Sequence, residues 1–221
     1  MKPLKLTMRA FGPYKDEEII DFSKLENHRL FVISGKTGAG KTTIFDGIAF
    51  ALYGSGSGSD RKDQKSLRSQ FADDHVHTAV ELLFEVHGKT YRVFRQLPHV
   101  KKGRKTATGE DYAFFEIGPN GEELKVVERQ KAKEINTKIE EIIGLTYDQF
   151  NQIIMLPQGE FRKLLTSQTE NKEAILRKIF KTERYGEIAK KLEDKKQLAE
   201  TEAKMAKAMR DQYIDQILGA L

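Results

Sequence analysis

A glycine-rich run ending in lysine and threonine is the part of this sequence best suited to bind a nucleotide. The run reads SGKTGAGKTT, and Gly35, Gly40, Lys41 and Thr42 fit the pattern G-x-x-x-x-G-K-[ST]. Glycines let the backbone curl so that several N–H groups point into one concavity, where side chains would collide with phosphate. The sequence therefore predicts a phosphate-binding loop made of Gly35, Lys36, Thr37, Gly38, Ala39, Gly40, Lys41, Thr42 and Thr43.

Three residues at the end of this loop have expected roles in binding or catalysis. Lys41 should reach the β- and γ-phosphates, the Thr42 hydroxyl should ligate Mg²⁺, and Thr43 should hold the α-phosphate region. The positive end of the helix that begins near Lys41 adds to the attraction. A guanine-reading Asn-Lys-x-Asp is absent, since the string at 136–140 has the wrong spacing. We therefore expect ATP and Mg²⁺ as cofactors.

The acidic residues that hydrolysis requires are missing from the sequence. An apolar strand ending in Asp-Asp or Asp-Glu would hold the magnesium ion and polarise the attacking water, and no such string follows the loop. The nearest approximation, Leu82 to Glu85, continues the alternation of its own strand and predicts an exposed glutamate. We expect a chain that binds ATP but does not hydrolyse it alone.

A second candidate for metal contact is Gln158 in the stretch MLPQGEF. Pro157 and Gly159 place this glutamine on a turn, where its amide is free to reach a metal or a water. Most glutamines in such turns are ordinary loop residues, so the stretch alone leaves both interpretations open.

Positive charges gather in two places. HVKKGRK places Lys101, Lys102, Arg104 and Lys105 on the expected tip between two strands, where a solvated hairpin tip is the simplest interpretation. A weaker cluster is formed by Arg61, Lys62, Lys65 and Arg68. The nearby DDHVH at 73–77 is better explained as a loop and strand edge than as a metal site.

The elements that must position these residues follow from hydrophobic periodicity. Short strands are expected at 4–8 and 18–22, and a strand buried on both faces at 30–34 should lead into the loop. A helix at 42–53 should follow, then a mobile Gly/Ser-rich loop at 54–60. Further strands at 78–86, 89–96 and 112–117 predict an antiparallel meander, and a helix is expected within 128–144.

Bulk composition fits a cytoplasmic protein without a membrane segment. Of 221 residues, 38% are apolar and 32% are charged, the net charge is +5, and there is no cysteine. The longest apolar run, 48–53, is too short to span a bilayer. From residue 167 onward the sequence is a charged helical pattern with a narrow apolar stripe, which is typical of a coiled coil that needs a partner helix.

The order and spacing of these motifs resemble the N-terminal half of the SbcC family of ATPases, relatives of the Rad-fifty and SMC proteins. The resemblance rests on SGKTGAGKTTIFDGIAFALYG, MLPQGEFRKLL, LTMRAFGPYKDEEIIDFS and GLTYDQF. It implies an α/β P-loop NTPase fold. Residues 1–166 would form the N-terminal lobe of an ABC-type ATPase head with an antiparallel β-meander, and 167–221 would begin a protruding coiled-coil helix.

The resemblance also implies a function. The chain would be the ATP-binding half of an ATPase for DNA double-strand-break repair and recombination that controls an SbcD-type exonuclease and endonuclease subunit. Gln158 would be the glutamine that senses magnesium and γ-phosphate. The missing acidic strand would lie on the protein's own C-terminal half, and a second head, two nuclease subunits and double-stranded DNA would complete the assembly. The resemblance also offers an alternative to a solvated tip for Lys101, Lys102, Arg104 and Lys105, which would contact the phosphates of duplex DNA.

One departure from the family and two rival classes remain. Relatives carry Asn-Phe-Arg where this chain has Ala10-Phe11-Gly12, so the role of that arginine is not transferred, although Arg9 could lie near the nucleotide. An SMC or condensin head would be structural rather than nucleolytic. An ABC transporter ATPase is disfavoured because its glutamine loop follows the phosphate loop sooner and no coiled coil emerges.

Overall fold

The computed structural model describes residues 1–25, 28, 30–57, 64–155 and 183–218. The chain divides into two compact units, Met1–Phe161 and Arg162–Leu221. The predicted boundary at residue 166 lies outside the described residues. None of the described helices is long and apolar enough to cross a membrane.

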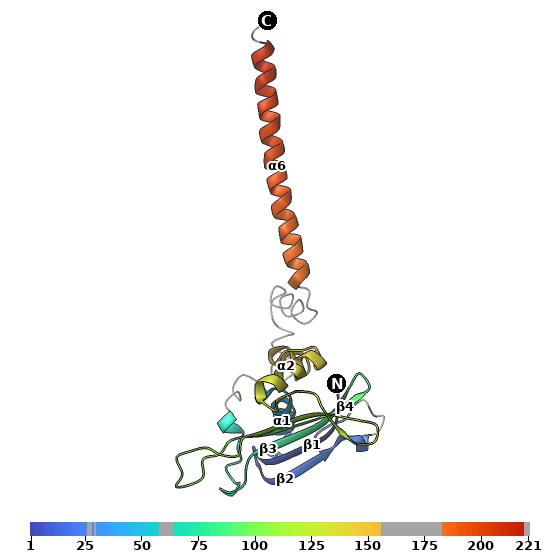
Figure 1. Cartoon of the computed structure of the whole chain (residues 1–221), viewed down its shortest axis with the longest axis vertical. Helices are drawn as coiled ribbons and strands as arrows, with labels where there is room; N and C mark the ends of the chain where they lie inside the picture. Colours follow the sequence, from blue (N-terminus) through green and yellow to red (C-terminus); the bar gives the residue numbers. More distant parts are fainter. Residues whose placement is uncertain (26–27, 29, 58–63, 156–182, 219–221) are drawn as a thin grey trace. The chain divides into compact units, whose positions relative to one another are not determined.

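The first unit is built on an antiparallel sheet of six strands in the order β2-β1-β3-β4-β5-β6 (Figure 1). The predicted meander is confirmed, and the sheet extends it with a short sixth strand. The strands are β1 (Lys2–Phe11), β2 (Tyr14–Asp21), β3 (Ala79–Val86), β4 (Lys89–Gln96), β5 (Asp111–Ile117) and β6 (Glu123–Lys125). Short 3-10 turns, η1 (Phe22–Leu25) and η3 (Gln64–Leu67), flank the phosphate-loop region in the sequence.

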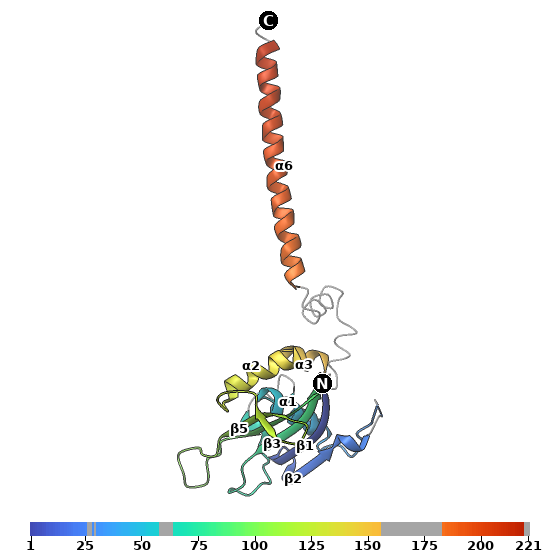
Figure 2. The ribbon, with the colours of Figure 1, turned by 45° about the vertical axis from the view of Figure 1, so that its right-hand side comes forward.

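Three helices lie on one side of this sheet (Figure 2). They are α1 (Lys41–Tyr53), α2 (Ala132–Ile143) and α3 (Tyr147–Ile153). Alternate residues of β3, namely Val80, Leu82 and Phe84, are fully buried beneath them, as period-two alternation requires. Helix α2 buries Ile135 and Ile139, which confirms the apolar face expected there. Glu85, which was predicted to be exposed, lies on the other face of the sheet and is half buried.

The strand expected at 30–34 does not form, and that prediction was wrong. Leu30 and Val32 are 87% and 85% exposed, and neither belongs to a strand. A strand buried on both faces needs hydrogen-bonding neighbours on both sides and a covering layer. The described residues provide none beside this segment, so its apolar side chains face solvent.

The prediction of a mobile loop at 54–60 was also wrong for residues 54–57. Gly54 ends α1 in the left-handed conformation, with φ of 77°, and its N–H donates to the Phe50 carbonyl. Ser57 is 7% exposed and donates through both its N–H and its hydroxyl to Asp46. A short polar side chain can therefore be buried where glycine-rich sequence suggested freedom. Residues 58–60 lie outside the described residues.

The second unit contains a single described helix, α6 (Glu183–Leu218), of 36 residues. The apolar stripe of this helix is exposed along its length. The exposed fractions are 72% for Tyr185, 48% for Ile188 and 62% for Leu192, and 63–65% for Leu198, Met205 and Met209. Such a stripe is typical of a helix that pairs with another helix.

Candidate nucleotide-binding site

The phosphate loop lies at the N-terminus of α1. Gly40 is the residue before the helix, with φ of 86°, and within the described part of the chain no side chain caps the first turn. Residues 34–39 are exposed. A Cβ placed on Gly38, where φ is 84°, would meet no heavy atom within 4 Å. Uncapped helical N–H groups facing an open glycine loop favour an anion.

Lys41 points back across this loop. Its ammonium group donates to the carbonyls of Gly35 (2.9 Å) and Lys36 (2.8 Å). Both partners are uncharged main-chain groups, so the positive charge has no carboxylate partner in the described part of the chain. The residues present therefore fit a phosphate group, with Lys41 and the α1 N–H groups as its donors and the Thr42 hydroxyl as an oxygen ligand for Mg²⁺.

The β1–β2 turn packs directly against the loop, which sequence reasoning did not anticipate. The Tyr14 hydroxyl donates to the Gly40 carbonyl at 3.1 Å. A Cβ on Gly12, where φ is 56°, would come within 2.6 Å of the Thr43 methyl group. Burial, and secondarily the nearby Glu18, raises the pKa of Tyr14.

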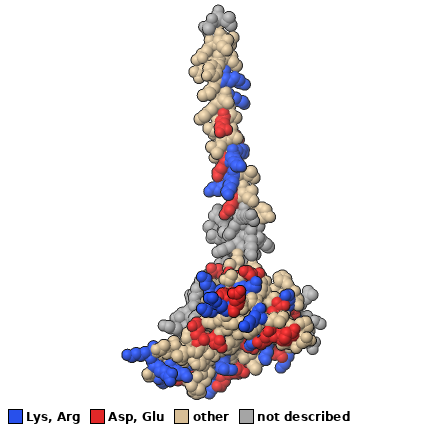
Figure 3. Space-filling view, viewed as in Figure 1, with Lys and Arg blue, Asp and Glu red and all other residues tan. Residues whose placement is uncertain are grey.

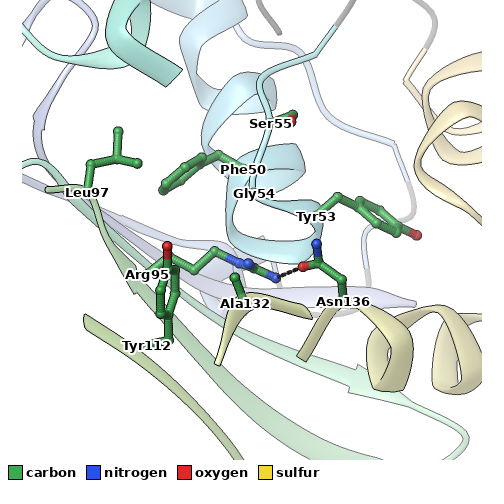
Figure 4. A pocket seen from close by; sticks show the side chains of 9 residues that line it. All are labelled: Phe50, Tyr53, Gly54, Ser55, Arg95, Leu97, Tyr112, Ala132 and Asn136. Atoms are coloured by element: carbon green, nitrogen blue, oxygen red, sulfur yellow. Dashed lines mark hydrogen bonds between the residues drawn. The ribbon is translucent and has the colours of Figure 1, made fainter. Parts of the chain in front are cut away.

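Helix α1 is held at its other end by Arg95 of β4 (Figure 4). Arg95 is 1% exposed, and its guanidinium donates to the carbonyls of Ala51 (2.7 Å) and Leu52 (2.8 Å). It also donates to the Asn136 side chain of α2 at 2.6 Å. Burial lowers the pKa of Arg95 to about 10. A cation at a helix C-terminus interacts favourably with the helix dipole, so Arg95 fixes the helix that carries the phosphate loop.

Two tyrosines join α1 and its following loop to the α2–α3 region. The Tyr53 hydroxyl donates to the Leu145 carbonyl at 3.0 Å, and the Tyr147 hydroxyl donates to the Gly56 carbonyl at 2.6 Å. Burial raises the pKa of Tyr53 well above its ordinary value, so it remains a donor. These contacts connect the phosphate-loop helix to α3, which precedes the predicted glutamine loop in the sequence.

Gln158 itself lies outside the described residues, so its predicted contact with metal remains a prediction. Arg9, the other residue considered near a nucleotide, forms an ion pair with Glu17 across the β1–β2 hairpin at 2.7 Å. Both side chains are about half exposed, at 52% and 44%. Arg9 therefore has a partner on its own hairpin.

The basic hairpin loop, defined as residues 97–110 between β4 and β5, carries the four predicted DNA contacts. Lys102, Arg104 and Lys105 are exposed and Lys101 is half buried. Lys and Arg side chains gather at the lower left of the head (Figure 3). In the described part of the chain none of these four cations forms an ion pair. The loop therefore presents free positive charge.

This loop is braced at its base by Asp74. The Asp74 carboxylate pairs with His99 Nε2 at 2.9 Å and accepts from the Lys102 N–H at 2.8 Å. The hydrogen bond from His99, followed by that from Lys102, lowers the pKa of Asp74. Among the described residues, no group of three His, Asp or Glu side chains is placed to hold a metal ion.

In the weaker basic cluster, Arg68 has a structural role. Its guanidinium donates to the carbonyls of Val76 (2.6 Å) and Asp73 (2.9 Å), so Arg68 is bonded to the loop that precedes β3. Arg61 and Lys62 lie outside the described residues, and the side chain of Lys65 is not described.

Tyr14 and Arg95 are the site-forming residues that sequence reasoning missed. The sequence signal for Tyr14 was the Gly12-Pro13 turn before it, which places an aromatic residue where the chain reverses. Arg95 occupies a core-facing position in an alternating strand, flanked by the inward-facing Val93 and Leu97. A charged residue at an inward position predicts a buried hydrogen-bond network.

An α/β lobe in which a glycine-rich loop opens a buried helix defines a P-loop nucleotide-binding protein. The family model described as AAA domain matches residues 5–217. The chain belongs to this AAA domain family.

Among curated proteins the chain is similar to the SbcC subunit of the nuclease SbcCD from two staphylococci. It is 43% identical to that of Staphylococcus epidermidis over 188 residues, covering 85% of this chain and 18% of the relative. For Staphylococcus aureus (strain MRSA252) the identity is 40% over 204 residues, covering 91% and 20%. The chain thus spans about a fifth of the length of these relatives.

Among solved structures, the chain is similar to the SMC head domain from Thermotoga maritima, and the match covers 62% of this chain and 42% of the SMC chain. The sequence identity is 22% and the TM-score is 0.38.

Proposed function

We propose that this chain is the ATP-binding half of an SbcC-type ATPase that controls an SbcD-type nuclease in DNA double-strand-break repair and recombination. The observation that carries the proposal is the glycine-rich loop at the N-terminus of α1, where the Lys41 ammonium group, among the described residues, bonds main-chain carbonyls and no carboxylate. ATP supplies the free energy of the cycle when it is bound. Lys41 and the α1 N–H groups hold its phosphates, and the Thr42 hydroxyl holds Mg²⁺.

The exposed segment 30–34 supports the proposal that a second polypeptide segment completes the head. Leu30, Phe31 and Val32 are 87%, 44% and 85% exposed directly before the phosphate loop. Apolar residues exposed in sequence next to a binding site favour a partner surface. We assign that surface to the protein's own C-terminal half, which would add neighbouring strands and the missing acidic residues. Gln158 would couple bound magnesium to pairing with a second head.

Turnover by the completed head tests this proposal. The chain alone should hydrolyse ATP at background rate, and addition of the separately expressed C-terminal half should restore magnesium-dependent turnover. The Lys41→Ala chain mixed with the same half should remain at background. Efficient hydrolysis by the chain alone would contradict the account of the missing carboxylates.

The basic hairpin loop is the proposed contact for double-stranded DNA. Its four cations have no ion pairs within the described residues, so phosphate oxygens can replace counterions there without breaking a protein contact. Binding of this kind is independent of sequence and weakens as salt rises. The assembly would contain two chains of this type and two nuclease subunits around the DNA.

Charge reversal separates this surface from ordinary solvated lysines. Replacing Lys101, Lys102, Arg104 and Lys105 by Glu should weaken duplex binding by the completed head. The slope of log affinity against log salt concentration should become shallower by up to about 0.9 for each phosphate contact that is lost. The matched control reverses four exposed lysines elsewhere in the first unit: Lys2, Lys15, Lys24 and Lys133. Equal DNA affinity in the two variants would make the hairpin loop a solvated tip.

A further inference from the structure

The peptide between Gly40 and Lys41 is oriented from two sides. Gly40 directly precedes α1, so its carbonyl is the acceptor position for the first hydrogen bond of the helix, and a side chain outside the helix contacts it as well. Gly40 has φ of 86° and ψ of 10°. Glycine adopts this left-handed conformation at little energetic cost, but it adopts several others as readily. The Gly40 carbonyl is the acceptor for the Tyr14 hydroxyl at 3.1 Å. Because a trans peptide is planar, the Lys41 N–H points away from the Gly40 carbonyl and therefore away from Tyr14.

That N–H is one of the free donors at the start of α1. The first N–H groups of a helix have no partner inside it, and they are the groups that bind phosphate in such loops. The hydrogen bond from Tyr14 to the Gly40 carbonyl therefore adds to the bond of the helix in holding the Lys41 N–H in the orientation required for phosphate. Without the Tyr14 hydroxyl this peptide loses one of its two restraints, and the donor is held less firmly toward the phosphate.

Tyr14 is itself held firmly by the turn that carries it. The Gly12 N–H donates to the Leu67 carbonyl at 2.8 Å, and Phe11 pairs with Tyr14 to close the hairpin. Phe11 is fully buried, with its ring centroid 5.7 Å from that of Phe50 in α1. An irregularity in β1 at Ala10, where φ is 48°, bends the strand into this turn. The turn is thus anchored to the helix whose loop it contacts.

The contact is close enough to restrict the residue type on both sides. A Cβ on Gly40 would come within 2.5 Å of the Tyr14 hydroxyl oxygen and 2.8 Å of Pro13 Cγ. Burial, followed by the charge of Glu18, raises the pKa of Tyr14, so the hydroxyl keeps its proton at neutral pH.

We infer that Tyr14 is a positioning residue for nucleotide binding: its hydroxyl presets the Gly40–Lys41 peptide so that the Lys41 N–H faces the phosphate. The inference rests on the proposed nucleotide-binding function and names a residue outside the glycine-rich motif that sets its affinity. Tyr14 does not touch the nucleotide in this account; it acts through the loop.

Tyr14→Phe tests the inference because it removes only the hydroxyl and keeps the ring that packs against Gly40. Titration of the chain with a fluorescent ATP analogue and Mg²⁺ should show affinity weakened by about 3- to 10-fold, the range expected for one hydrogen bond. The melting temperature without nucleotide should fall by no more than about 4 °C, the shift expected for one hydrogen bond in a chain of this size. Tyr112→Phe is the matched control, since its hydroxyl bonds Glu110 away from the loop and its loss should leave nucleotide affinity unchanged.

A second measurement reads the peptide directly. In a chain labelled with ¹⁵N-lysine, the Lys41 amide resonance should shift or broaden in Tyr14→Phe without any nucleotide, and it should be unaffected in Tyr112→Phe. Unchanged affinity in Tyr14→Phe, or an unchanged Lys41 resonance, would overturn the inference. Failure of the unaltered chain to bind nucleotide would instead overturn the proposed function, while the resonance would still test the peptide contact.

Discussion

Removing the buried charge of Arg95 should destabilise the first unit more than any single surface charge does. Arg95→Met keeps a long apolar side chain in the space beside α1 but removes three hydrogen bonds. The carbonyls of Ala51 and Leu52 and the amide oxygen of Asn136 each lose a donor. The first two belong to the last turn of the helix that carries the phosphate loop.

The magnitude follows from these three acceptors. A buried acceptor left without a donor costs about 1–3 kcal/mol. Relief of the desolvation cost of a buried guanidinium, which is 1% exposed, offsets part of the sum. We expect a net loss of about 3 kcal/mol in the free energy of unfolding, equivalent to a fall of roughly 6–12 °C in melting temperature. Arg95→Lys should lose somewhat less, because one ammonium group cannot reach all three acceptors.

Urea unfolding followed by near-ultraviolet circular dichroism measures this loss. The chain has 7 tyrosines and no tryptophan, and Tyr53 and Tyr91 are buried in the core. The signal therefore reports on tertiary packing rather than on α6. Arg9→Met is the control, because Arg9 is 52% exposed and its single ion pair should be worth less than about 1 kcal/mol. Equal losses in the two variants would refute the anchoring role of Arg95.

Three further changes have expected outcomes. Ser57→Ala removes the hydroxyl donor to buried Asp46 and should cost about 1–2 kcal/mol of unfolding free energy in the same urea assay. Gly40→Ala places a Cβ within 2.5 Å of the Tyr14 hydroxyl and should abolish nucleotide binding in an equilibrium titration; retained affinity would show that the turn yields easily. Burial, then neighbouring positive charges, lowers the pKa of His77 below 6.5. As the pH falls, the unfolded chain therefore takes up a proton at His77 before the folded chain does, and the free energy of unfolding decreases as the pH drops through about 6.5. His77→Gln should make this decrease smaller between about pH 7 and 5.5 in the same urea assay.

The sequence predicted those elements whose signal is local. The alternation in β3 and β4 and the apolar face of α2 were read correctly because buried residues repeat with the period of each element. The phosphate-binding loop could be predicted because its glycines and lysine are adjacent in the sequence. Its position at the start of α1 agrees with that prediction.

Other features depend on contacts between distant residues. Tyr14 meets Gly40 across 26 positions and Arg95 meets Ala51 across 44, and neither pairing leaves a periodic trace. The segment 30–34 has the composition of a buried strand, but a strand also needs neighbours, which the described part of the chain does not provide. Ser57 was misread because glycine and serine indicate freedom on average, while one serine can still satisfy a buried carboxylate.

The most direct test of the phosphate-loop site is to compare equilibrium binding of ATP and magnesium by the unaltered chain and by the Lys41→Ala variant. A titration monitored by the fluorescence of a labelled ATP analogue should give saturable binding to the unaltered chain. Lys41→Ala should show no measurable binding while its melting temperature stays the same, because the hydrogen bonds of the lysine within the described residues go to two exposed loop carbonyls. Equal affinity for the nucleotide in the two proteins would contradict the assignment of this loop as the site.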